Sequence, residues 1–132
     1  MLAYLWIAMG GALGSVGRFW FSGVVARQLG ETFPWGTLLV NVSGSFLIGV
    51  LAAMAEPGER RLLGPSGHQF FIVGLCGGFT TFSTFSVQTL DMLRSGDWFG
   101  ASANAGGSVV VCLVAVWVGY ALGSTVTAAS PA

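Results

Sequence analysis

The stretch from residue 74 to residue 86 holds the side chains whose types and spacing best suit chemistry. It reads Gly-Leu-Cys-Gly-Gly-Phe-Thr-Thr-Phe-Ser-Thr-Phe-Ser and lies inside a long apolar segment. Two adjacent glycines can break a helix, and a break at membrane depth frees backbone groups that only protein or a water-filled path can satisfy. Phe79, Phe82 and Phe85 recur every third residue, so we expect them near one face of the resumed helix. The pattern indicates a pore or binding site, and a kinked core helix is the alternative.

A polar stripe precedes this stretch in the chain. Thr37, Asn41 and Ser45 follow one another at four-residue intervals, which places them on one helix face. The Asn41 amide offers two hydrogens without a fixed charge, which suits an anion that must enter a pore and leave it again. A structural role, in which the amide joins neighbouring helices, is the alternative.

A second stripe lies near the C-terminus, where Gly100, Asn104, Ser108 and Cys112 recur every fourth residue. Asn104 and Ser108 are candidates to add donors to the same path as Asn41. Packing of small residues against a neighbouring helix explains the spacing equally well.

Composition and hydropathy identify the elements that must position these residues. The chain of 132 residues is 54% hydrophobic and 8% charged, whereas soluble domains carry about 25% charged residues. A transmembrane helix needs about 20 mostly apolar residues. Four segments meet this length, and we expect the tail 124–132 to be disordered. The predicted spans, which form a single all-α membrane domain, are 2–25, 35–55, 69–93 and 99–123.

The first span combines small residues with a charge. Gly10 and Gly14 form a small-xxx-small pair, which predicts close packing against another helix. Arg18 lies near the end of this span, where an ionisable side chain is costly. Its side chain either snorkels to the lipid headgroups or draws anions into a vestibule.

The remaining charges and polar groups exclude several classes of function. The net charge is zero and lysine is absent, which argues against a nucleic-acid partner. Cys76 and Cys112 lie in apolar segments, and the single histidine completes no metal cluster. No nucleophile–base pair is evident, so we do not expect an enzyme. The first two spans contain no carboxylate, which argues against a proton-coupled carrier.

Three stretches resemble the signatures of one family, the Fluc (CrcB) fluoride channels. They are residues 36–41 (Gly-Thr-Leu-Leu-Val-Asn), residues 77–86 (Gly-Gly-Phe-Thr-Thr-Phe-Ser-Thr-Phe-Ser) and, in the first span, residues 11–18 (Gly-Ala-Leu-Gly-Ser-Val-Gly-Arg). The resemblance covers all four spans in order and length. It implies a bacterial inner-membrane channel that exports fluoride and confers fluoride resistance, built as an antiparallel homodimer of four-helix subunits with a broken third helix.

The resemblance also implies roles for individual positions. Asn41 would be the pore amide, and the ring edges of Phe82 and Phe85 would face fluoride. Gly77 and Thr80 would hold a structural sodium ion through their backbone carbonyls at the dimer axis. Further polar positions near the pores would be Thr37, Ser83 and Ser108. The chain departs from the family pattern at Asn104, where members often have an aromatic residue, and at Cys112, where some have serine.

The distribution of arginines agrees with dual topology. Arg60 and Arg61 lie on one side of the predicted membrane, whereas Arg27 and Arg94, with Arg18 nearby, lie on the other. This near-balance removes the positive-inside bias that normally sets orientation.

The alternative function is a small dual-topology, proton-coupled multidrug exporter. Such an exporter needs a carboxylate in its first span. The nearest acidic residue, Glu31, falls in a predicted loop.

Overall fold

The computed structural model describes residues 1–56 and 62–129, and this part of the chain is helical without a strand. The loop residues Arg60 and Arg61 therefore lie outside the described residues. The elements are α1 (Leu2–Leu29), α2 (Trp35–Ala55), α3 (Pro65–Gly67), the π-helical segment η1 (His68–Cys76), α4 (Gly77–Phe79), α5 (Phe82–Arg94) and α6 (Trp98–Ala129).

These elements follow the four predicted spans. Three stretches of the described residues are long and apolar enough to cross a membrane, namely Trp35–Ala55, Pro65–Arg94 and Trp98–Ala129. The first predicted span is also a helix, the 28-residue α1. It is not one of the three, because glycine, serine and Arg18 lower its hydropathy.

The third predicted span is broken, but three residues later than the adjacent glycines suggested. Gly77 is helical, with φ −63° and ψ −37°. Thr80 and Thr81 are extended instead, with ψ values of 157° and 114°. The prediction of a break is therefore confirmed, whereas its expected cause, the flexibility of Gly77 and Gly78, is wrong.

Glycines lie where α1 meets η1 and α4. A Cβ at Gly10 would collide with the backbone of Phe70, and one at Gly14 with the backbone of Leu75. On the opposite side of the contact, a Cβ at Gly78 would meet the backbone of Gly11. The small-xxx-small prediction for α1 is therefore confirmed, because only the hydrogen atoms of glycine fit between α1 and the η1–α4 segment.

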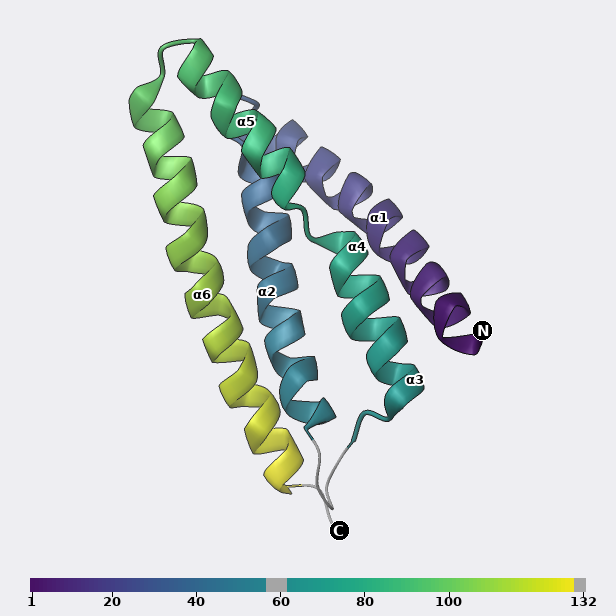
Figure 1. The fold of residues 1–132 in the computed structure, drawn as a ribbon. Coiled ribbons are helices and arrows are strands. Elements are labelled where there is room, and N and C mark those ends of the chain that lie inside the picture. Colours follow the sequence, from purple (N-terminus) through teal and green to yellow (C-terminus); the bar gives the residue numbers. More distant parts are fainter. Residues whose placement is uncertain (57–61, 130–132) are drawn as a thin grey trace.

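A second close contact joins α2 to α6, which run side by side (Figure 1). Glycines again lie where the backbones meet. A Cβ at Gly49 would collide with the Val116 carbonyl, and a Cβ at Gly119 would collide with the backbone of Phe46.

The break allows the two halves of the third segment to contact different neighbours. Residues from η1 and α4 pack on α1, whereas α5 packs mainly on α6 (Figure 1). The break itself therefore lies near the centre of the helical layer, beside α2.

The last helix is longer than predicted. It continues to Ala129, so the expectation of disorder is wrong for residues 124–129. Side-chain hydroxyls near the C-terminus of α6 donate to backbone carbonyls of the preceding turn. The Ser124 hydroxyl donates to the Tyr120 carbonyl and the Thr127 hydroxyl to the Gly123 carbonyl, each over 2.9 Å. These bonds satisfy polar side chains within the helix and keep a polar sequence compatible with it.

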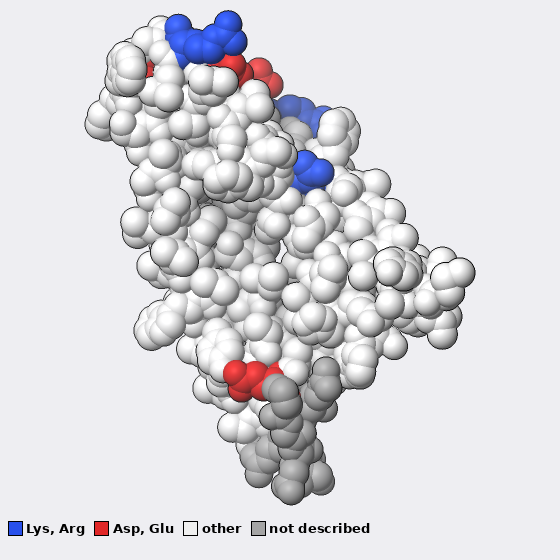
Figure 2. All heavy atoms as spheres, in the orientation of Figure 1, with Lys and Arg blue, Asp and Glu red and all other residues white. Residues whose placement is uncertain are grey.

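The surface has the character of a protein that faces lipid. Large apolar side chains are exposed along the helices, and Phe19 and Phe99 are 83% and 86% exposed. Charged side chains gather toward the two ends of the face in Figure 2, with a largely uncharged band between them.

The α2–α6 contact predicts the effect of one added methyl group. Gly119→Ala should lower the free energy of unfolding by about 1–3 kcal/mol, because the Cβ must push against the Phe46 backbone. Gly106→Ala on the same helix is the matched control, since its Cβ would meet nothing within 4 Å. Denaturant titration of both purified variants measures the difference. Equal stability of the two would contradict the proposed packing.

Candidate functional site

The Asn41 side chain pairs with the backbone at the helix break. Its Nδ2 donates to the Thr81 carbonyl over 2.9 Å, and its Oδ1 accepts from the Thr81 amide over 2.7 Å. The side-chain oxygen thus gives the Thr81 amide the partner that it loses at the break, as a polar group at membrane depth requires. The helix-joining role considered for Asn41 is therefore present. One Nδ2 hydrogen remains for another acceptor, since the amide has two.

A cavity of about 360 Å³ adjoins this pair, here called the Asn41 cavity. It lies between α2, the break, α5 and α6. The structure brings together four of the predicted fluoride-pore residues here, Asn41, Phe82, Phe85 and Ser108, and Thr80, predicted for the sodium site, also lines the cavity. The full lining is Asn41, Ser45, Ile48, Thr80, Thr81, Phe82, Phe85, Ser108, Val109 and Cys112.

The other two predicted fluoride-pore residues lie outside this cavity. Thr37 is buried and lines a different, larger cavity. Ser83 is exposed, with its hydroxyl 3.2 Å from the Thr81 hydroxyl. The four-residue spacing placed Thr37 on the same helix face as Asn41. The two residues are a full helical turn apart, however, and they line different cavities.

The phenylalanine prediction is correct for two of three rings. Phe82 and Phe85 lie together, with ring centroids 5.3 Å apart and planes inclined by 42°. Phe79 precedes the break and instead packs against Phe21 of α1, at 6.1 Å. The expected single face of three rings is therefore wrong, because the extended residues interrupt the helical period.

The start of α5 opens beside the cavity. Thr81 is its N-cap, and the Thr81 hydroxyl accepts from the Thr84 amide over 3.2 Å. The amides of a helix N-terminus, with the positive end of the helix dipole, favour a nearby anion. Sequence reasoning missed Thr81, although a hydroxyl residue three positions before Thr84 is a recognisable cap signal.

The other side of the break presents carbonyl groups. In a continuous helix the Thr81 amide would bond to the Gly77 carbonyl, but here it donates to Asn41. Gly77 is exposed and Thr80 is partly exposed. Carbonyl oxygens at a helix C-terminus carry partial negative charge and suit a hard cation.

Arg18 reaches this same helix end. Its Nε donates to the Gly78 carbonyl over 3.2 Å, which is a favourable place for a cation. Arg18 is half-buried and does not line the large cavity that the structure describes at this side of the fold. The vestibule role expected for it stays a prediction.

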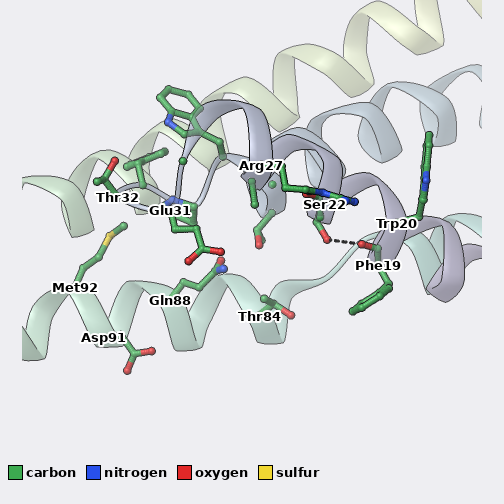
Figure 3. Close-up of a pocket in the computed structure, with 18 of the residues that line it drawn as sticks. Phe19, Trp20, Ser22, Arg27, Glu31, Thr32, Thr84, Gln88, Asp91 and Met92 are labelled. Atoms are coloured by element: carbon green, nitrogen blue, oxygen red, sulfur yellow. Dashed lines mark hydrogen bonds between the residues drawn. The ribbon is translucent and has the colours of Figure 1, made fainter.

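The large cavity, of about 1020 Å³, lies between the end of α1, the α1–α2 connection and α5. Figure 3 shows Gln88 and Met92 of α5 facing Glu31 and Thr32 of the connection. The cavity has charged residues on its walls, namely Arg27, Glu31, Asp91 and Asp97.

Comparison with known proteins identifies the chain's relatives. The family model described as "CrcB-like protein, Camphor Resistance (CrcB)" matches residues 5–120. A protein of Opitutus terrae named "Fluoride-specific ion channel FluC" is 61% identical over 120 residues, 91% of each chain. Proteins of the same name are 54% identical in Methylocella silvestris, covering 89% of each chain, and 50% identical in Rhodospirillum rubrum, covering 90% of this chain and 92% of the relative.

The relatives match nearly the whole chain, including α1, α2, the broken third segment and most of α6. The chain is a multi-pass membrane protein of the bacterial inner membrane. A match of this length and identity shows that the chain belongs to the CrcB family.

Proposed function

We propose that this chain forms a passive, fluoride-selective channel that exports fluoride from the cytoplasm. The observation that carries the proposal is the Asn41 cavity, which joins an amide donor, two phenylalanine rings and a serine hydroxyl. Membership of the CrcB family and the names of the relatives support it. The expectation that the protein is not an enzyme agrees with this family.

The chemistry of the cavity suits a small anion that must not be trapped. Asn41 supplies a neutral donor through its second Nδ2 hydrogen, and the edges of the Phe82 and Phe85 rings are weakly positive. None of these groups carries a full charge. Conduction needs anion binding that is favourable enough for entry yet weak enough for release. Several neutral groups placed along one path meet both needs. A narrow path would favour fluoride over the larger chloride ion.

The driving force needs no coupling ion. Hydrogen fluoride crosses membranes as a neutral weak acid and dissociates in the less acidic cytoplasm, where fluoride accumulates. The inside-negative potential then favours export, by about 2.3 kcal/mol per charge for each 100 mV.

The channel would be an antiparallel homodimer with dual topology. The near-balance of arginines supports insertion in both orientations. An inverted pair would supply the internal symmetry that one short chain lacks. A structural sodium ion would lie at the dimer axis, held by the carbonyls of Gly77 and Thr80. The loss of the helical partner of Gly77 supports this site, since its carbonyl is available to a hard cation.

The multidrug-exporter alternative has little to support it. Glu31 is exposed in the connection after α1, so no carboxylate lies within α1 or α2. The relatives are named for fluoride instead.

Reconstitution of the purified chain alone tests the proposal. Liposomes loaded with fluoride should release it through the protein, because the cavity needs no partner ion or energy source. A fluoride electrode measures the efflux, and chloride-loaded liposomes are the control. Equal efflux of both anions would refute selectivity, and no efflux of either would refute a channel made of this chain alone.

Asn41→Asp should abolish fluoride efflux, with a loss of at least about tenfold, because a fixed negative charge repels fluoride. The carboxylate keeps the side-chain shape but also removes the donor to Thr81. Gln88→Glu is the matched control, because it makes the same exchange in the large cavity outside the Asn41 cavity. Flux assays in liposomes compare the two. Normal efflux through Asn41→Asp would remove Asn41 from the pore.

Phe82→Ile and Phe85→Ile should each reduce efflux at least about tenfold, because isoleucine has no positive ring edge to offer an anion. The substitution keeps an apolar side chain at each position. The control is Phe99→Ile, since Phe99 is 86% exposed on α6 and lies outside the Asn41 cavity. If both test variants conduct normally in the electrode assay, the rings serve only to pack.

A further inference from the structure

The side chain of Asn104 is buried at the contact between α5 and α6. It is 2% exposed, and it is not one of the residues that line the Asn41 cavity. Its Nδ2 donates to the Thr89 hydroxyl of α5 over 2.8 Å. The sequence made Asn104 a candidate to extend the line of donors, but its amide faces the neighbouring helix instead.

This amide connects two residues of the Asn41 cavity without touching the cavity. The Thr89 hydroxyl donates onward to the Phe85 carbonyl over 2.8 Å. On the other side, the Ser108 hydroxyl donates to Asn104 Oδ1 over 3.4 Å. A chain of hydrogen bonds therefore runs from Phe85 on α5 to Ser108 on α6, with Asn104 at its centre.

Hydrogen bonds join α5 to its neighbours in the chain, because packing within one chain buries none of its 13 residues. Two extended residues separate it from α4. Lipid also provides little hydrophobic drive for helix association. Its N-terminus is attached by the Asn41–Thr81 pair. The Asn104–Thr89 bond is a second attachment about two turns later.

We propose that Asn104 is a positioning residue for anion conduction. With Thr89 it fixes the rotation of α5 about its axis, and so holds the Phe85 ring in register with Ser108. The inference rests on the proposed channel function. One attachment at Thr81 fixes only the N-terminus of α5. Two attachments, at Thr81 and Thr89, flank Phe82 and Phe85 and so define where both rings lie.

Flux measurements on α5 variants test this role. Thr89→Val removes the hydroxyl and keeps the shape, and should slow fluoride efflux at least about tenfold, because the buried Asn104 amide loses its acceptor. Thr89→Ser keeps the hydroxyl and should conduct as the wild type does. Asn104→Leu should match Thr89→Val, and the double variant should be no slower than either, because both changes break one connected unit. Thr127→Val is the control, since Thr127 makes the same bond to a carbonyl four residues back.

A spectroscopic measurement separates positioning from general destabilisation. Phe85 is replaced by 4-fluorophenylalanine, and its ¹⁹F resonance is recorded in the background of each variant. Thr89→Val and Asn104→Leu should shift or broaden the signal, whereas Thr127→Val and Thr89→Ser should leave it unchanged. Each protein must elute as a single folded species before comparison.

The two measurements distinguish failure of this inference from failure of the proposed function. The inference is overturned if Thr89→Val and Asn104→Leu conduct fluoride as the wild type does. It is also overturned if their ¹⁹F signal is unchanged, because their loss of flux would then not act through Phe85. Absence of fluoride efflux from the wild type would refute the proposed function instead. The ¹⁹F comparison would still report whether Asn104 positions α5.

Discussion

The pairing of Asn41 with the backbone of Thr81 is the interaction on which the rest of this structure depends. A break at membrane depth leaves the Thr81 amide without its helical partner, and lipid offers none. The Asn41 side chain accepts from this amide over 2.7 Å and also donates to the Thr81 carbonyl over 2.9 Å. Because the Thr81 backbone is satisfied in this way, the chain can remain extended for two residues between the helices of its third segment.

The break has consequences on both of its sides. The preceding half ends in carbonyls, one of which accepts from Arg18, and the following half begins with amides capped by Thr81. Opposite partial charges therefore lie a few residues apart at the centre of a low-dielectric layer. That polarity suits an anion near α5 and a cation near α4, which is the division that the proposed fluoride path and sodium site require.

Different interactions hold α5 and the other helices in place. The contacts of α1 with η1 and of α2 with α6 are backbone against backbone at glycines, and they leave no space for a side chain. In contrast, α5 has no buried residue and is attached through the amides of Asn41 and Asn104. The Asn41 cavity lies where α5 meets α2 and α6, so these hydrogen bonds lie close to its walls.

Hydropathy and residue spacing were sufficient to predict the four helical segments, the glycine contact of α1 and a break in the third segment. These features are local, since they follow from the period of a helix and the apolar length of a span. Tertiary structure alone decided which threonine Asn41 pairs with and that Gly77 and Gly78 stay helical. It also decided that Thr37 reaches another cavity and Asn104 faces Thr89. The reason is that a freed backbone group takes whichever partner a neighbouring helix brings within reach, and that choice depends on packing between residues 40 to 60 positions apart in the chain.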